Sequence, residues 1–328
     1  MRRNLILGLL LAAGAPFCLD HQAIAQDFPN KPITLIVPFA PGGSSDVIAR
    51  LVGAKLTESL KQTVVIESKP GGAGVIAMQI AARAPADGYT LILGHIGTMA
   101  VNPAMFEKLP YDAVKDFMPV SLVATVPTVL VVHPSLPATN LKEFLDLAKA
   151  KPGSINLGSA GNGSAGHLAS EYLKQVTKLD KDSIVHVPYR GTGPMLTDLL
   201  AGQTQATVTG AIPVLPHIKA GKLRVIAVGT TKRLDVLPDV ATVAEAGFPG
   251  FETSQWYGIL APANTPTAIV TKLSTEIAAA LKAPDVVAKL KADGSEPIGS
   301  TPEEFAAFIT KEAVRWGAVV KTAGIKAE

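Results

Sequence analysis

Short apolar runs of four to six residues alternate along the chain with segments in which apolar residues recur at helical spacing. Strands that are buried on both faces are almost uniformly apolar, so this alternation is typical of parallel strands joined by crossover helices. The pattern predicts an α/β fold whose sheets are mostly parallel and flanked by helices. The runs predict strands at residues 33–37, 63–66, 90–93, 129–132, 155–157, 184–187, 206–209 and 223–228.

Capping residues and prolines in the sequence predict where several helices begin. Apolar residues recur at helical spacing from 141 to 148, and Asn140 with Glu143 forms a start signal that resembles a capping box. Thr265-Pro266 and Thr301-Pro302 begin two more helices, with proline at the first helical position. We therefore expect the C-terminal quarter to be mostly helical.

Prolines stand where the chain could cross between two lobes, at Pro119 and Pro127 and again at Pro238, Pro249 and Pro262. A chain of 328 residues is large for one core but natural for two lobes. We predict a hinged architecture in which the middle of the chain forms one lobe and both ends form the other. The predicted segments are a signal peptide at 1–25, the first part of the first lobe at 26–125, the second lobe at 126–248 and the mostly helical remainder of the first lobe at 249–328.

The N-terminus indicates export. Arg2 and Arg3 precede an apolar run at 5–13, and the small residues at 23–25 predict cleavage after Ala25 and a periplasmic mature chain. The single cysteine, Cys18, lies inside this signal, so the mature chain has no disulfide and must be stabilised by a large core. The formal net charge is only +3 and no basic cluster occurs, which makes nucleic acid and anionic membranes poor partners.

Five loops of small residues are the most informative feature of the sequence, and four of them come directly between a predicted strand and a predicted helix. Glycine lets the backbone approach a ligand closely, and a helix start presents unpaired N–H groups and the positive end of its dipole. Any one loop alone is explained better as a tight turn with a helix cap, but together the loops predict pockets for an anion. The loops are residues 41–45, 70–74, 94–98, 158–166 and 191–193.

Other chemistries fit these loops less well. None contains the Gly-Lys-Ser or Gly-Lys-Thr of a nucleotide-binding loop, and the dinucleotide-like spacing of Gly72, Gly74 and Ala77 is separated from its strand. The segment around Ser164 has Asn162 where a nucleophile elbow has glycine, which leaves an exported serine hydrolase as the alternative function. The histidines lack the spacing of a zinc site. We expect no metal and no cofactor.

Many short motifs, taken in order, resemble the receptor family of tripartite tricarboxylate transporters, the Bug-type proteins. The resemblance covers essentially the whole mature chain. It implies a periplasmic solute-binding protein with a two-lobed Venus-flytrap fold of type II, without catalysis, that delivers small carboxylates to a membrane transporter. The motifs are residues 31–46, 69–74, 87–91, 97–103, 111–117, 187–191 and 216–221.

The resemblance also implies where the ligand binds. The ligand loops of the family correspond to residues 39–45, 97–98, 159–167 and 189–191, and many relatives have an acid where this chain has Thr209. The candidate ligand-binding residues are Phe39, Ala40, Gly42, Gly43, Ser44, Ser45, Gly97, Thr98, Ser159, Asn162, Ser164, His167, Tyr189, Arg190, Gly191, Thr192 and Thr209.

These residues suggest a mechanism and a ligand class. Backbone N–H groups at 42–45 are expected to hold a carboxylate from the first lobe while hydroxyls and His167 hold it from the second, so that the ligand stabilises the closed form. Asp46 is the only acid in the candidate loops, which disfavours ligands that carry an ammonium group, and the scarcity of aromatic residues disfavours sugars. We expect a monomer whose partner is a transporter's membrane subunits or a sensor protein.

Overall fold

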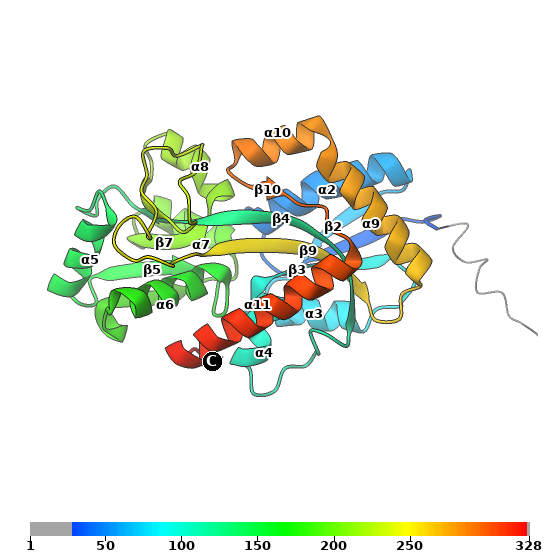
Figure 1. The fold of residues 1–328 in the computed structure, drawn as a ribbon, viewed down its shortest axis with the longest axis horizontal. Coiled ribbons are helices and arrows are strands. Elements are labelled where there is room, and N and C mark those ends of the chain that lie inside the picture. Colours follow the sequence, from blue (N-terminus) through cyan, green and yellow to red (C-terminus); the bar gives the residue numbers. More distant parts are fainter. Residues whose placement is uncertain (1–27, 327–328) are drawn as a thin grey trace, which may run out of the picture.

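Two long antiparallel strands, β4 (Phe117–Val132) and β9 (Ser254–Pro262), run side by side through the middle of the molecule and connect two groups of parallel strands (Figure 1). The computed structural model describes residues 28–326. The predicted signal peptide and its cleavage after Ala25 lie outside this range. Within it, no helix is long and apolar enough to cross a membrane.

One group of strands forms the first lobe. Its strands β1, β2 and β3 are mutually parallel in the order β2-β1-β3, and β3 then pairs antiparallel with β9. Helices cover both faces of this half of the sheet (Figure 1). The elements of the first lobe are β1 (Ile33–Val37), α2 (Ser44–Leu60), β2 (Val64–Ser68), η1 (Gly72–Gly74), α3 (Val75–Ala82), β3 (Thr90–His95), η2 (Gly97–Val101), α4 (Asn102–Met105), α9 (Thr267–Lys282), α10 (Pro284–Ala292), β10 (Glu296–Pro297) and α11 (Pro302–Ala323).

The second lobe repeats this arrangement with the middle of the chain. Strands β7, β5 and β6 are parallel to one another, and β7 and β8 each pair antiparallel with β4. The elements of the second lobe are α5 (Leu141–Ala150), β5 (Ile155–Ser159), α6 (Ala165–Thr177), η3 (Lys181–Ser183), β6 (Ile184–Pro188), α7 (Thr192–Leu200), β7 (Ala206–Gly210), α8 (Ala211–Lys219) and β8 (Arg224–Val228).

The strand β4 belongs to both lobes. It pairs with β9 from Phe117 to Pro127 and with β7 from Thr128 to Val132, so the change of partner falls between Pro127 and Thr128. The α/β class and the two-lobed architecture predicted from the sequence are confirmed by this topology. The lobe boundaries at 126 and 248 stay a prediction.

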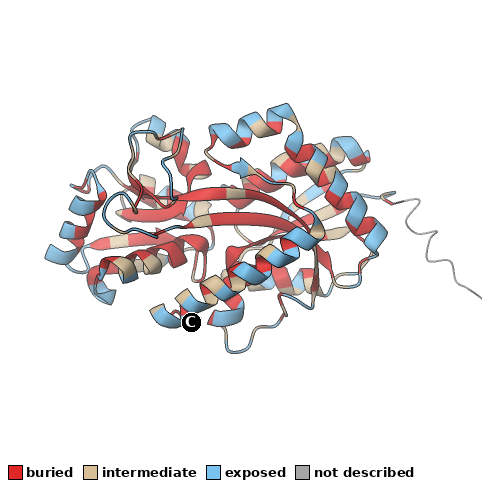
Figure 2. Ribbon diagram, in the orientation of Figure 1, coloured by how far each residue is buried: buried red, intermediate tan, exposed pale blue. Residues whose placement is uncertain are grey.

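The strands are buried almost throughout, whereas the helices alternate between buried and exposed faces (Figure 2). Both tryptophans belong to the core of the first lobe, where Trp256 is 1% and Trp316 is 2% exposed. Their indole nitrogens both donate to Oε2 of buried Glu312, over 3.0 and 2.9 Å. These tryptophans therefore stabilise the lobe and present no face to a ligand.

Local signals placed several helices correctly. Oδ1 of Asn140 accepts the backbone N–H of Glu143 at the start of α5, and Thr301 with Glu304 completes a capping box at the start of α11. Pro266 is the residue before α9 rather than its first helical residue. The C-terminal quarter is mostly helical as predicted, but it also contains β9, which the sequence reading did not include.

Candidate ligand-binding site

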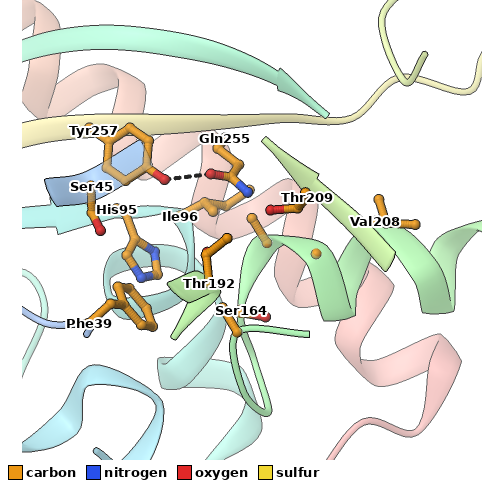
Figure 3. Close-up of a pocket in the computed structure, with 13 residues that line it drawn as sticks. Phe39, Ser45, His95, Ile96, Ser164, Thr192, Val208, Thr209, Gln255 and Tyr257 are labelled. Atoms are coloured by element: carbon orange, nitrogen blue, oxygen red, sulfur yellow. Dashed lines mark hydrogen bonds between the residues drawn. The ribbon is translucent and has the colours of Figure 1, made fainter. Parts of the chain in front are cut away.

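A small cavity of about 20 Å³, which opens to solvent, lies between the two lobes, and we call it the inner cavity. Its lining contains aromatic, hydroxyl, amide and imidazole groups but no aspartate, glutamate, lysine or arginine. Figure 3 shows these side chains converging from both lobes. The inner cavity is lined by Phe39, Ser45, His95, Ile96, Ala160, Ser164, Ala165, Gly166, Thr192, Val208, Thr209, Gln255 and Tyr257.

Helix starts surround the inner cavity. Ser45 lies in the first turn of α2, Ala165 and Thr192 are the first residues of α6 and α7, and Thr209 stands two residues before α8. The first N–H groups of a helix have no partner within the helix, and the helix dipole makes this end positive. The fold thus gathers partial positive charge at a cavity whose lining has no ionised side chain.

Ser164 illustrates how one of these helix starts is built. Its backbone is extended, and its Oγ accepts the backbone N–H of His167 over 3.3 Å, so it caps α6. The side chain is nevertheless part of the cavity lining. Because a hydroxyl oxygen that accepts one bond can still donate its own proton, Ser164 can cap the helix and bind a ligand oxygen at once.

Two polar side chains of β9 form one wall of the inner cavity. The hydroxyl of Tyr257 donates to Oε1 of Gln255, which leaves the amide nitrogen of Gln255 on the side of Thr209 (Figure 3). Burial raises the pKa of the Tyr257 hydroxyl well above its usual range, so this bond persists at every physiological pH. Gln255 is therefore oriented as a donor to the cavity.

His95, the last residue of β3, occupies another wall. Its Nδ1 accepts the backbone N–H of Gly97 over 2.5 Å, and its ring stacks on Phe39 with centroids 4.5 Å apart. Burial lowers the pKa of His95 to about 3, so the imidazole is neutral at physiological pH. Gly97 must be glycine here, since a Cβ on this residue would collide with the imidazole.

A second cavity of about 250 Å³ shares Phe39 and Ala160 with the first, and we call it the outer cavity. Its lining includes the backbone of 71–74 and a single charged side chain, Arg190, which is exposed. The shared residues leave the two cavities adjacent. The outer cavity is lined by Phe39, Gly71, Gly72, Ala73, Gly74, Phe106, Ala160, Gly161, Asn162, Pro188, Tyr189 and Arg190.

The two lobes touch each other beside these cavities. The backbone N–H of Ala40 donates to the carbonyl oxygen of Arg190, and a Cβ on Gly191 would lie 2.8 Å from the nitrogen of Ala40. A Cβ on Gly193 would collide with the carbonyl oxygen of Pro41. Gly42 and Gly191, which were predicted as ligand contacts, are thus where the backbones of the two lobes approach, and Gly43 approaches the side chain of Thr192.

Some predicted site residues have partners inside the protein. The Thr98 hydroxyl bonds to the backbone of His95, and the Ser159 hydroxyl to Nε2 of His186 over 2.6 Å. His167 stacks on His186 at 4.0 Å with its Nδ1 accepting the N–H of Gly163, and it does not line the inner cavity. Burial is the main cause that lowers the pKa of His167 to about 3 and that of His186 to about 4.

Ser44 and Asp46 also lie beside the cavity rather than in its lining. Ser44 is buried against Tyr257 and Gly210. Asp46 accepts the N–H of Gly42 at Oδ2 over 3.3 Å and pairs through Oδ1 with Arg50 at 2.9 Å. The one acid in the candidate loops is therefore engaged in holding the turn before α2.

Comparison with known proteins decides the family. A model of the tripartite tricarboxylate transporter family receptor matches residues 48–325. The chain belongs to this receptor family. Among its relatives, it is 38% identical to BugT of Bordetella pertussis over 98% of this chain and 97% of that one. It is equally identical, at 38%, to a protein of Pseudomonas sp. strain P51 encoded between tcbD and tcbE, over 96% of this chain and 92% of that one.

Solved structures of relatives have the same fold. The protein Rpa4515 of R. palustris, solved with adipate, is 41% identical and superposes with a TM-score of 0.88 over 92% of this chain and 99% of that one. MatC of Rhodopseudomonas palustris, solved with bound malate, is 36% identical and gives 0.85 over 89% and 100%. The two-lobed periplasmic-binding-protein fold predicted from the sequence is thereby confirmed.

Sequence reasoning missed three polar side chains that line the inner cavity, namely Gln255, Tyr257 and His95. Gln255 and Tyr257 come from β9, a strand that the sequence reading did not contain, and they are distant in sequence from every glycine-rich loop. His95 lay within a predicted loop but was considered only as a metal ligand. Its place at the end of an apolar run, two residues before Gly97, was the available signal.

Proposed function

We propose that this receptor captures a small carboxylate in the periplasm and delivers it to the membrane subunits of a tripartite tricarboxylate-type transporter. The observation that carries the proposal is the inner cavity itself: four helix starts, with hydroxyl, amide and imidazole groups, and no charged side chain in its lining. Hydrogen bonds from neutral donors to a charged acceptor contribute about 1.5 to 3 kcal/mol each. Several of them offset the desolvation of one carboxylate, which costs several kcal/mol.

The proposed ligand is a dicarboxylate. One carboxylate occupies the inner cavity between Ser45 and Ser164, and the carbon chain passes Phe39. A second anionic group then meets the backbone of 71–74 and Arg190 in the outer cavity. The relatives solved with adipate and with malate agree with this class of ligand.

The proposed mechanism is a ligand-dependent closure. A carboxylate that contacts Ser45 of the first lobe together with Ser164 and Thr192 of the second binds the closed form and not the open one. Its differential affinity for the two forms shifts the population toward closure. The transporter then recognises the closed form.

We propose that the chain has no catalytic activity. An exported hydrolase would need a base for Ser164, and among residues 28–326 no imidazole nitrogen is hydrogen-bonded to its Oγ. Its recorded partner is the backbone N–H of His167. Incubation with a set of generic esters tests this point, and burst kinetics that disappear in Ser164→Ala would overturn it.

Binding is tested with named probes. Succinate, malate and adipate are titrated into the purified mature protein while the melting temperature is recorded, and native mass spectrometry identifies any small molecule that copurifies. A ligand present at one hundred times Kd stabilises the protein by about 2.7 kcal/mol. Absence of any shift with all three acids, with a non-acidic molecule copurifying, would contradict the proposal.

A further inference from the structure

The imidazole of His95 carries a nitrogen that the rest of the protein does not use. Its Nε2 is buried, with the residue only 4% exposed, and it has no hydrogen-bond partner among residues 28–326. A buried polar atom left without a partner costs about 1 to 3 kcal/mol, so native proteins satisfy nearly all such atoms. His95 also lines the inner cavity. A group within the cavity is therefore the natural partner of this nitrogen.

The hydrogen-bond pattern fixes which nitrogen of His95 carries the proton. Nδ1 accepts the N–H of Gly97 and must therefore be unprotonated. A neutral imidazole has one N–H, so in this tautomer the proton is on Nε2. Burial disfavours the doubly protonated ring, and the lining of the inner cavity supplies no carboxylate to stabilise it.

The ring is also held in place. Phe39 stacks on it, and Tyr257 meets it edge-on with centroids 6.3 Å apart; Figure 3 shows the imidazole between the two rings. The Thr98 hydroxyl bonds both the N–H and the carbonyl oxygen of His95, each over 3.2 Å. Such packing leaves the Nε2–H direction preset before any ligand arrives.

We infer that His95 is a specificity-determining residue of this receptor, which donates its Nε2–H to an oxygen of the bound carboxylate while its ring stays neutral. The inference rests on the proposed function and adds a residue to it. This uncharged N–H can donate to a carboxylate, carbonyl or ether oxygen, but it cannot accept a hydrogen bond from an ammonium or hydroxyl group. Tyr257, which is protonated, is the titratable group that faces the ring. Binding should therefore not weaken as the pH rises from 5.5 to 8.

Two variants separate the donor from the shape of the ring. His95→Gln places an amide N–H near the position of Nε2, whereas His95→Leu removes the donor and keeps an apolar side chain. Calorimetry with adipate should give about a 10- to 100-fold weaker Kd for His95→Leu, and a Kd within a few-fold of wild type for His95→Gln. The control His133→Leu changes a histidine of the second lobe that bonds to Ser135 and lines neither cavity, and its Kd should not change.

The outcomes that overturn the inference are distinct from those that overturn the proposed function. Equal affinity in His95→Leu and wild type, equal losses in folded Leu and Gln variants, or a wild-type Kd that rises tenfold between pH 5.5 and 8 would each overturn it. Long-range proton–nitrogen NMR reads the tautomer of His95 without any ligand, and a proton on Nδ1 at pH 7 would also overturn it. If wild type binds none of succinate, malate and adipate while NMR shows the Nε2–H tautomer, the proposed ligand class fails and with it the role of His95 toward a carboxylate, although the tautomer itself is confirmed.

Discussion

The backbone N–H of Ala40 donates a hydrogen bond of 3.3 Å to the carbonyl oxygen of Arg190, and this bond joins the first lobe directly to the second. It lies next to the places where Gly191 and Gly193 approach the turn at 40–41. The two lobes thus contact each other through their backbones at this point, and glycine is required where a side chain would keep the lobes apart.

Gly193→Ala should hinder closure without harming the second lobe. The new Cβ would collide with the carbonyl oxygen of Pro41 across the cleft, while alanine suits the α7 backbone. We expect adipate to bind at least about tenfold more weakly, a loss of about 1.4 kcal/mol, and no longer to reduce the radius of gyration measured by X-ray scattering.

The matched control for this variant is Gly317→Ala in α11, where the new Cβ would lie 3.8 Å from Ala104, an ordinary contact. This control should bind adipate like wild type and compact on binding. If Gly193→Ala also compacts fully with unchanged affinity, the contact with Pro41 does not limit closure.

Ser164→Ala should reduce both stability and affinity, because the hydroxyl caps α6 and lines the inner cavity. The lost cap costs about 1 kcal/mol of unfolding free energy. The lost hydrogen bond to a carboxylate should weaken binding by about 1.5 to 3 kcal/mol in calorimetry. Asn140→Ala removes the equivalent cap of α5, outside the inner cavity, and should lower stability alone. Identical Kd values for the two variants would restrict Ser164 to capping.

Succinate should bind at least about tenfold more tightly than aspartate, a difference of about 1.4 kcal/mol. Asp46 is the only acid in the candidate loops, and its carboxylate is bonded to the N–H of Gly42 and to Arg50. The lining of the inner cavity contains no acid. A buried ammonium would therefore lack a counter-charge, which costs several kcal/mol. Paired titrations at one pH and ionic strength measure the difference, and aspartate binding as tightly as succinate would contradict the expectation.

The buried histidines should make the protein less stable in acid. Burial lowers the pKa of His95 and of His167 to about 3, from the ordinary histidine value of 6.5. Between pH 6.5 and pH 3 these histidines bind protons in the unfolded chain but not in the folded chain. The free energy of unfolding is therefore highest above pH 6.5 and falls as the pH drops toward 3. Each such histidine contributes a slope of up to about 1.4 kcal/mol per pH unit.

Urea unfolding at pH 7, 5.5 and 4.5 measures this slope. His167→Gln removes one titrating group, and comparison with wild type cancels the contribution of the carboxylates that both proteins share. The variant should lose less stability between pH 7 and 4.5 than wild type does. Parallel stability curves would mean that His167 takes up its proton without unfolding the protein.

The glycine-rich loops could be predicted because their signals are local. Strand ends, small residues and caps such as Ser164 and Asn140 lie within a few positions of one another, and the structure puts most of the loops around the cavities. The loops could not reveal which hydroxyls have partners inside the protein. The Thr98 hydroxyl is hydrogen-bonded to the backbone of His95, and the Ser159 hydroxyl is hydrogen-bonded to the ring of His186. Only the folded chain creates these contacts.

Strand β9 and the first part of β4 were missed, because only residues 129–132 of β4 were predicted as a strand. Pro119 and Pro127 were interpreted as places where the chain crosses between the lobes, and proline lacks the N–H that a sheet needs. In β4 the first stands beside a register shift and the second stands where β4 changes partner, positions at which that missing bond costs little. Because β9 was absent from the prediction, no predicted element placed Gln255 and Tyr257 at the site.

The strands β4 and β9 also determine how a bound molecule can leave. Ser164, Thr192 and Thr209 follow or adjoin strands of one sheet half, which we expect to move as a body if β4 and β9 bend. These contacts therefore break together rather than one after another. Escape from the receptor should follow a single exponential whose rate is set by the stiffness of two hydrogen-bonded strands, and a membrane partner could accelerate it by bending them.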